Sequence, residues 1–444
     1  MDPVIKVGIL FAPEVKFCLN GKYRHLPSGE IFEGQGSVQI KDGKPHLLVE
    51  GRAVDAQWPV LFEPLDYDTG SFDLMDVTIG INFHWERKQD QRFKGSLEVI
   101  SEPEHLTAIN VISLEDYLTS VISSEMSASS SPELLKAHAV ISRSWLLAQI
   151  EKGKLVKTDG KYVSSLDGPG ERIRWYDRED HLHFDVCADD HCQRYQGITN
   201  VTRKAVEEAI EITRGQVLAY QDKVCDARYS KCCGGISERF ENVWEPVKHP
   251  YLDMVIDNAE PPAGFDTDLT KETASQQWIL GNPPAFCNTQ DKEILSQVLK
   301  DYDQETFDFY RWEVALSQER IQELLRTRVN VDVGQVLDLV PVERGVSGRL
   351  IKLQIVGTKG SMIIGKELEI RKAFSSSHLY SSAFVPEKGE MKDGIPQSFS
   401  LKGAGWGHGV GLCQIGAAVM GVKGYDFKTI LAHYFNGAEL NILY

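Results

Sequence analysis

A glycine-rich segment near the C-terminal end carries residues whose types suggest ligand binding. Six glycines lie between Gly403 and Gly416, interleaved with Trp406, His408 and Gln414. Glycines at this density indicate positive φ or close approach of the backbone to a ligand. Backbone amides beside these three side chains would suit a polar, ring-shaped ligand. The alternative is a tightly packed turn leading into a C-terminal helix. A phosphate loop is disfavoured because no Lys-Ser or Lys-Thr follows the glycines.

Glu125 is the candidate for acid–base chemistry. It ends the amphipathic segment SLEDYLTSVISSEM, and a Ser-rich connection follows it. A carboxyl at the C-terminal end of a helix meets the unfavourable end of the helix dipole, which favours the protonated form that a general acid needs. A solvated surface glutamate is the competing interpretation.

Cysteines and histidines gather in one stretch that could bind a metal. Cys187 and Cys192 lie close to His183, with His181 and His191 as further imidazoles. Thiolates with imidazole form a donor set that suits Zn²⁺. We take His183, Cys187 and Cys192 as the expected ligands; a disulfide between the two cysteines and a pair of reduced thiols are the alternatives.

The remaining cysteines allow two further interpretations. Cys232 and Cys233 could add a metal ligand or pair with Cys225. His408 and Cys413 invite comparison with a cysteine hydrolase. Five residues of glycine-rich chain rarely give the geometry of a nucleophile and its base, so we disfavour that reaction.

The elements that must position these residues are β-rich at first and helical afterwards. Short alternating segments broken at Gly, Asp and Asn predict antiparallel β structure over residues 4–112. Two helices follow. The first begins at the N-cap Ser113, and the second begins at Ser131 with Gly153 past its end.

The chain divides into four predicted regions of an α+β fold, mixed and β-rich, with a two-helix catalytic segment and an inserted or second α+β domain. They are a β-rich N-terminal region (1–95), the catalytic region (96–260), the inserted α+β domain (261–396) and a glycine-rich C-terminal motif that completes the catalytic region (397–444).

Composition restricts the class of protein. Of 444 residues, 42% are apolar and 25% charged, which is typical of globular chains and not of disordered or membrane-spanning ones. The formal net charge of −16 disfavours nucleic acid as a partner. No export signal is visible at Met1, so we expect either a protein that stays inside the cell or a chain whose leader has been removed.

Two long motifs resemble the SpoIID/LytB family. The first is LEDYLTSVISSEM followed by PELLKAHAVISRSWLLA, and the second is GWGHGVGLCQIGAAVMGVKGYDFKTILAHYF. Further similarity lies in HCQRYQG, YSKCCGGISERFENVW and WEVALSQERIQELL, so the resemblance covers most of residues 95–444. His138 stands where the family usually has Gln.

The resemblance implies a cell-envelope protein that acts on peptidoglycan. Sporulation members of the family are lytic transglycosylases on glycan strands, and the family's catalytic glutamate corresponds to Glu125. Some members carry a zinc site of one His and two Cys, in the neighbourhood of Cys187 and Cys192. The expected substrate-binding residues are Arg143, Tyr229, Ser230, Trp406, His408 and Gln414. Arg143 has the alternative of pairing with an acid in the core.

Three functions follow as hypotheses. The first is a lytic transglycosylase in which Glu125 protonates the glycosidic oxygen and then deprotonates the attacking hydroxyl, with no second carboxylate. The second is a non-catalytic peptidoglycan-binding enhancer of a cell-wall amidase, which the other branch of the family suggests. The third is a zinc hydrolase centred on Cys187 and Cys192.

Overall fold

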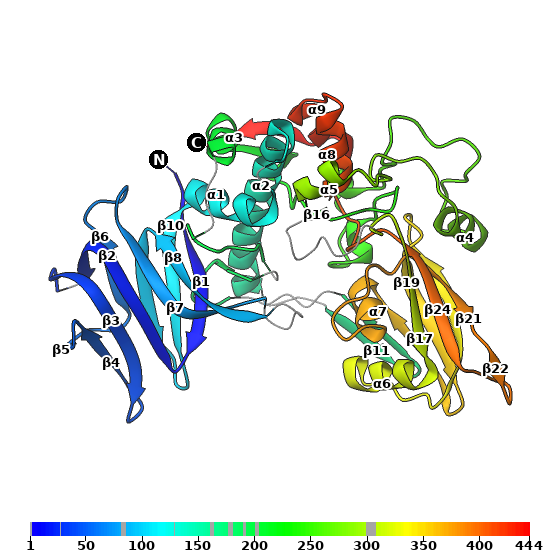
Figure 1. Ribbon diagram of the computed structural model, residues 1–444, viewed down its shortest axis with the longest axis horizontal. Coiled ribbons are helices and arrows are strands. Elements are labelled where there is room, and N and C mark those ends of the chain that lie inside the picture. Colours follow the sequence, from blue (N-terminus) through cyan, green and yellow to red (C-terminus); the bar gives the residue numbers. More distant parts are fainter. Residues whose placement is uncertain are drawn as a thin grey trace.

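The structure is a computed structural model that describes residues 2–26, 28–80, 86–127, 129–159, 164–175, 181–189, 192–199, 204–298 and 308–444. Figure 1 shows a large N-terminal sheet at one end, a central group of helices, and a second unit of sheets and helices at the other end. The predicted class, a β-rich α+β fold, is confirmed.

The N-terminal region forms one extended sheet. Its strands are β1 (Val4–Ala12), β2 (Glu14–Leu26), β3 (Ile31–Lys41), β4 (Lys44–Val49), β5 (Arg52–Val54), β6 (Val60–Pro64), β7 (Ser71–Ile79), β8 (Arg87–Lys94), β9 (Ser96–Ser101), β10 (Leu106–Ser113) and β13 (Val186–Cys187). Within the described residues the order is β13-β1-β10-β9-β6-β2-β3-β4-β5, and β7 pairs with β2 and β8.

Alternation along these strands builds the core of the sheet. In β2 the side chains of Val15, Phe17 and Leu19 are buried, and in β7 those of Phe72 and Leu74 are buried. Successive side chains of a strand point to opposite faces, so the intervening residues lie on the other face. The period-two pattern therefore predicted the strands of this region.

Helices from two distant parts of the sequence form the central region (Figure 1). They are α1 (Leu114–Glu125), α2 (Pro132–Asp159), α3 (Lys204–Ile212), α8 (Gln414–Val422) and α9 (Phe427–Tyr434). α8 and α9 pack against α2. A small sheet in the order β15-β14-β26 brings the C-terminal strand beside residue 216; its strands are β14 (Gln216–Tyr220), β15 (Lys223–Val224) and β26 (Glu439–Ile442).

The two predicted helix starts are confirmed. The Ser113 hydroxyl accepts from the amide of Asp116, and the Ser131 hydroxyl accepts from the amide of Leu134 at 3.3 Å. The predicted end of the second helix is wrong, because α2 continues past Gly153 for a total of 28 residues. A glycine inside a helix costs only about 1 kcal/mol, which packing of a long helix outweighs.

The second unit has its own core. One sheet has the order β17-β24-β21 and the other β11-β12-β20-β19-β18. The strands are β11 (Ser165–Gly168), β12 (Glu171–Arg174), β17 (Arg311–Ser317), β18 (Val336–Arg344), β19 (Leu350–Gly357), β20 (Gly360–Gly365), β21 (Phe384–Lys388) and β24 (Ser398–Ala404), and the helices are α6 (Gln318–Val329) and α7 (Glu367–Ala373). Trp312, Leu325 and Ile355 are among its buried side chains.

Short elements connect the regions. They are α4 (Glu272–Leu280), α5 (Lys292–Val298), β16 (Tyr229–Ser230), β22 (Met391–Lys392), β23 (Ile395–Pro396), β25 (Leu412–Cys413) and 3₁₀ turns at Phe240–Asn242 and Pro250–Leu252. Strand pairing crosses the predicted boundaries at residues 95 and 396, since β10 pairs with β1 and β24 pairs with β17. None of the described helices combines the length and apolar character needed to span a membrane.

Candidate active site

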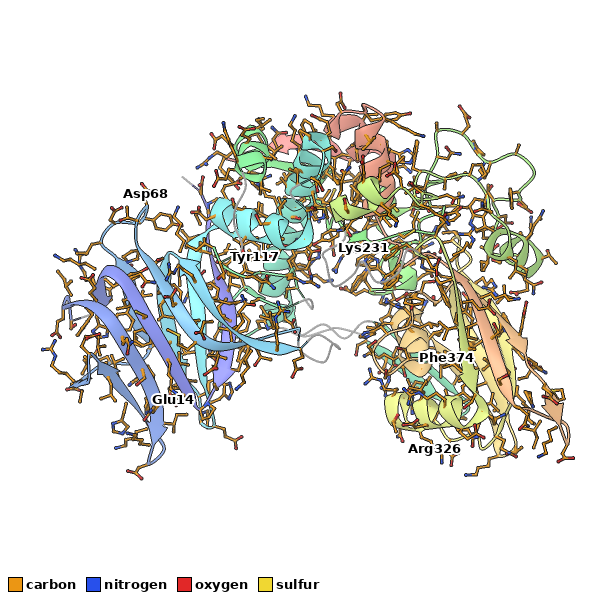
Figure 2. The ribbon with its side chains drawn as sticks, in the orientation of Figure 1. Glu14, Asp68, Tyr117, Lys231, Arg326 and Phe374 are labelled. Carbon is orange, nitrogen blue, oxygen red and sulfur yellow. The ribbon has the colours of Figure 1, made fainter. Side chains whose placement is uncertain are left out.

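Glu125 is the last residue of α1, and its side chain is half-buried. Fully buried apolar side chains such as Tyr117 (labelled in Figure 2) and Leu118 hold the helix in the core. The amide of Met126 closes the helix by donating to the carbonyl of Ile122 at 2.8 Å. A carboxyl on the last turn of a firmly packed helix keeps a defined position, as acid–base catalysis requires.

The turn that follows Glu125 is tied to α5 through Gln297. The backbone carbonyl of Gln297 accepts from the amide of Ser127 at 2.8 Å and from the hydroxyl of Ser130 at 2.8 Å. Its side-chain oxygen accepts from the amide of Ser131 at 3.0 Å. Helix α5 therefore fixes the path of the chain between α1 and α2.

Lys231 contacts the next residue of α5. Its Nζ donates to the carbonyl of Val298 at 2.6 Å, and Figure 2 shows it in the central region. The turn after Glu125 and the 229–231 stretch are thus bound to consecutive residues of one short helix. Helix α5 therefore connects the turn that follows Glu125 with the segment that carries Lys231.

Tyr229 and Ser230 lie beside the glycine-rich segment. β16 pairs in parallel with β25, with Tyr229 opposite Leu412 and Ser230 opposite Cys413. Tyr229 is half-buried, whereas Ser230 is 5% exposed and its hydroxyl has no hydrogen-bond partner within the described residues. The sequence placed these two segments along one site, and the strand pairing brings them together.

His138 and Gln414 form a buried hydrogen bond between α2 and α8. The amide Nε2 of Gln414 donates to Nε2 of His138 at 3.1 Å, and the other ring nitrogen bonds the hydroxyl of Ser142 at 3.1 Å. Burial, followed by the charge of Lys231, lowers the pKa of His138 to about 3. The ring is therefore neutral, and its edge packs on Tyr229 at 4.6 Å between centroids.

Gln414 was predicted to bind substrate, and its side chain makes a structural contact in this fold. Its side chain is 2% exposed, and its amide is occupied by His138. Gln414 instead joins the helix after the glycine-rich segment to α2. The sequence could not reveal this contact because 276 residues separate the two partners.

Trp406 and His408 are both half-buried and make aromatic contacts. The indole of Trp406 lies 4.3 Å from the ring of Tyr380 and 4.6 Å from that of Phe309. Nδ1 of His408 accepts from the amide of Val410 at 3.0 Å. Burial, together with the charges of nearby arginines, holds the pKa of His408 well below its usual range. Their role in substrate binding stays a prediction.

The glycines of this segment serve close packing. Gly405, Gly407, Gly409 and Gly411 all have positive φ, between 74° and 93°. A side chain on Gly405 would meet the backbone of Cys232 and Gly234 at about 3 Å. The alternation of glycines therefore permits a tight turn against the 228–235 stretch, as the packing alternative predicts.

Arg143 is fully buried and paired with an acid. Its Nη2 and Nε donate to the two carboxylate oxygens of Glu115 at 2.6 and 3.0 Å, and its Nη1 donates to the carbonyl of Gln216 at 3.0 Å. The guanidinium joins α1, α2 and β14. The alternative of a core ion pair is confirmed, and a role of Arg143 in substrate binding stays a prediction.

The imidazole beside the two thiols belongs to His181 and not to His183. Ligand atoms of His181, Cys187 and Cys192 all lie within 4.8 Å of one another, and Sγ of Cys192 is 3.5 Å from Nε2 of His181. His183 instead faces Glu102 at 3.5 Å. The expected set of His183, Cys187 and Cys192 is corrected accordingly, and His191 lies outside the described residues.

The thiol–imidazole group fits a soft metal and is packed against α1. Two sulfurs and one imidazole nitrogen are the donors that Zn²⁺ prefers. The hydroxyl of Tyr117 donates to Gln193 at 3.3 Å, and the amide of Gln196 donates to Ser120 at 3.2 Å. No disulfide is formed by any of the eight cysteines, all of which lie in the described ranges. A pocket lined by Gly8, Cys187 and Tyr195, among other residues, adjoins this group, and Glu125 does not line it.

Residues 102–220 match the family model described as Stage II sporulation protein, and residues 238–411 match a domain of unknown function (DUF8618). The first match contains Glu125 and the thiol–imidazole group. The second begins within the loop after β16 and ends inside the glycine-rich segment.

Three similar proteins illustrate the relationship. An uncharacterized protein of Brachyspira hyodysenteriae is 25% identical over 351 residues, covering 78% of this chain and 72% of that protein. The amidase enhancer of Bacillus subtilis is 24% identical over 54% of this chain, which spans only 32% of that protein. Stage II sporulation protein D of Bacillus amyloliquefaciens is 22% identical, covering 77% of this chain and 79% of that protein.

Proposed function

We infer that this chain, whose residues 102–220 belong to the SpoIID family, functions at the bacterial cell wall. Relatives named stage II sporulation protein D and amidase enhancer support this coarse assignment. We propose more specifically that the protein is a lytic transglycosylase of the cell envelope. Its substrate would be the glycan strand of peptidoglycan, cleaved between N-acetylmuramic acid and N-acetylglucosamine.

The observation that carries the proposal is the placement of Glu125. Its half-buried carboxyl ends α1 inside the family-matched region, next to a turn that shares α5 with Lys231. His138, which contacts Tyr229, has its pKa lowered to about 3 by burial, and burial likewise lowers the pKa of His408. Neutral imidazoles with such low pKa values are poor proton donors, so Glu125 is the best-suited acid.

The proposed reaction requires a single carboxyl. Protonated Glu125 gives its proton to the glycosidic oxygen as the bond to C1 of the muramic residue breaks. The resulting carboxylate then accepts the proton of the muramic O6 hydroxyl while that oxygen bonds to C1. The product is a 1,6-anhydro end, and the acid is regenerated without water. Half-burial suits this cycle because it keeps the carboxyl near the substrate and limits its solvation.

The net charge favours one form of the substrate. Strands that retain stem peptides carry many carboxylates, whereas strands stripped by an amidase are nearly neutral. A protein with a formal charge of −16 is repelled less by the second form. We therefore propose peptide-free strands as the substrate.

The test compares wild type with Glu125→Gln on intact and amidase-treated peptidoglycan. General acid–base groups contribute roughly 10²–10⁴-fold, so the variant should release soluble fragments at least about 100-fold more slowly. Glu211→Gln, an exposed change on α3, is the matched control and should retain full activity. Equal release by both Glu125 forms would refute the assigned acid.

An amidase-enhancing role is the second candidate, favoured by the similarity to the Bacillus subtilis amidase enhancer. It predicts that wild type and Glu125→Gln both bind peptidoglycan and both accelerate an added cell-wall amidase. Fragment release by the chain alone would then be absent.

We also propose that zinc is held by His181, Cys187 and Cys192. Bound there, it would clamp the 181–192 stretch beside α1 through soft, tightly bonded ligands. The hydrogen bond between Tyr117 and Gln193 would connect the 181–192 stretch to α1, the helix that carries Glu125.

A further inference from the structure

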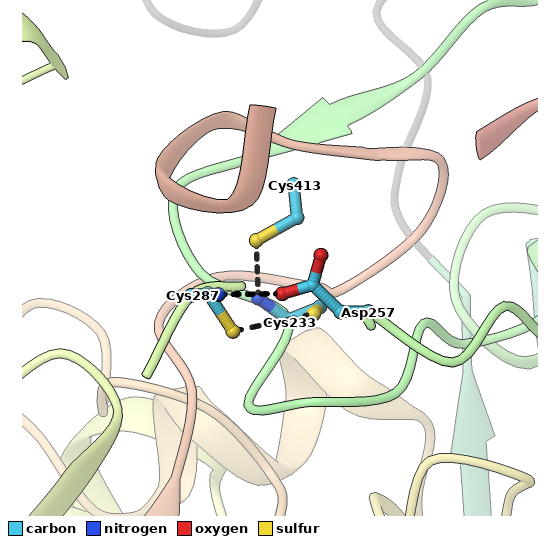
Figure 3. A group of neighbouring side chains, drawn as sticks. All are labelled: Cys233, Asp257, Cys287 and Cys413. Carbon is cyan, nitrogen blue, oxygen red and sulfur yellow. Dashed lines mark hydrogen bonds between the residues drawn. The ribbon is translucent and has the colours of Figure 1, made fainter. Parts of the chain in front are cut away.

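Four buried side chains from four separate segments meet beneath the glycine-rich turn. They are Cys233, which follows β16; Asp257; Cys287; and Cys413, which ends β25 (Figure 3). Their ligand atoms all lie within 4.8 Å of one another. Each residue is at most 3% exposed. This group shares no residue with His181, Cys187 and Cys192.

Hydrogen-bond donors point at the sulfur and oxygen atoms of the group. The amide of Cys233 donates to Sγ of Cys413 at 3.2 Å, and the amide of Gly235 donates to Sγ of Cys233 at 3.4 Å. Such N–H groups stabilise thiolates, and they recur around the ligands of protein-bound metals.

The carboxyl of Asp257 is held in the same way. It accepts from the amide of Cys287 at 2.8 Å and from the hydroxyl of Tyr434 at 2.6 Å. Asp257 is fully buried and forms no ion pair with any described residue. A buried carboxylate among sulfurs is costly unless a cation neutralises it.

Gly416 makes room for this carboxyl. A side chain at that position, in the first turn of α8, would collide with Oδ1 of Asp257 and with the hydroxyl of Tyr434. The glycine thus lets the helix approach the acid closely.

The separation of two of the sulfurs matches coordination of a single tetrahedral ion. Zn–S bonds of about 2.3 Å in a tetrahedron place neighbouring sulfurs about 3.8 Å apart. The Sγ atoms of Cys233 and Cys287 are 3.7 Å apart. That separation is far longer than a disulfide, which measures about 2.05 Å.

We propose that Cys233, Asp257, Cys287 and Cys413 form a closed, structural zinc site. Three thiolates and one carboxylate fill a tetrahedral coordination sphere, so no position is left for water or substrate. The ion would join the 229–235 stretch, the segments around Asp257 and Cys287, and the start of α8. It would thereby hold β16 and β25 together beside His138.

The decisive experiment uses a Cys187→Ser/Cys192→Ser double variant, which disables the other candidate site. The protein is purified with Zn²⁺ under reducing conditions, and zinc is counted by elemental analysis. X-ray absorption at the zinc edge then identifies the bound atoms. We expect one zinc per chain, with three sulfur neighbours and one oxygen. Absence of zinc, or a coordination shell without sulfur, would overturn the proposal.

A second set of variants tests the ligands in the otherwise intact chain. Cys287→Ser should lower the zinc content by one ion per chain. Cys225→Ser removes an equally buried thiol outside the group and should leave the content unchanged. Equal zinc content in both variants would refute the assignment.

Discussion

His138 links the stability of the fold to pH at the scale of a single residue. Burial lowers its pKa to about 3 from 6.5, so between these values the unfolded chain binds a proton that the folded chain does not. The stabilisation is fully present above pH 6.5 and is lost as the pH falls toward 3. Within that window one such group changes the free energy of unfolding by about 1.4 kcal/mol per pH unit.

The test is His138→Gln, which keeps a hydrogen-bonding side chain but cannot titrate. We measure the free energy of unfolding in urea between pH 4 and pH 6. Its slope against pH should be shallower for the variant, which should take up about one proton fewer on unfolding. Parallel curves for the two proteins would contradict the assigned neutral imidazole.

The Arg143–Glu115 pair is predicted to support stability. Arg143→Met leaves a buried carboxylate without its cation, and such a loss typically costs about 3–5 kcal/mol. Arg143→Met combined with Glu115→Leu removes both charges and should recover much of that loss. Unfolding free energies of the three proteins measure the effect, and a single variant as stable as wild type would show that the pair is dispensable.

The two histidines near the thiols can be separated by substitution. His181→Ala should lower zinc content, because its ring nitrogen lies 3.5 Å from Cys192. His183→Ala should leave zinc content unchanged, since its ring faces Glu102. Elemental analysis of both variants decides between them. Loss of zinc from His183→Ala but not from His181→Ala would identify His183, the ligand expected from sequence.

At the scale of elements, the N-cap of α1 determines how firmly the catalytic helix begins. Ser113→Ala removes the acceptor for the amide of Asp116 and should lower the free energy of unfolding by about 1 kcal/mol. Thr327→Ala, an exposed change on α6, serves as control and should stay within about 0.5 kcal/mol of wild type. Equal loss in both variants would argue against a specific cap.

Local patterns predicted the elements better than the contacts between them. Alternation identified the strands of the large sheet, and Ser113 and Ser131 identified both helix starts because capping acts within a few residues. The end of α2 was missed because its long-range packing overrides Gly153. Arg143 was assigned to substrate because sequence does not show that Glu115 faces it from the neighbouring helix.

At the scale of the whole molecule, segments near the C-terminus pack and pair with elements that lie much earlier in the sequence. β24 completes a sheet begun by β17, β26 pairs with β14, and α8 packs on α2. The group of Asp257, Cys287 and Cys413 depends on this packing and pairing. Asp257 and Cys287 are 30 positions apart, Cys287 and Cys413 are 126 positions apart, and no period or motif relates them. The pair Cys232–Cys233 was the only sequence signal for that site.

Isotope incorporation distinguishes the proposed chemistry of Glu125 from hydrolysis. Amidase-treated peptidoglycan is digested with wild-type protein in water enriched in ¹⁸O, and the masses of the soluble fragments are measured by mass spectrometry. We expect 1,6-anhydro ends without ¹⁸O, because the muramic O6 and not water attacks C1. Reducing ends that carry ¹⁸O would identify a hydrolase and contradict the proposed mechanism.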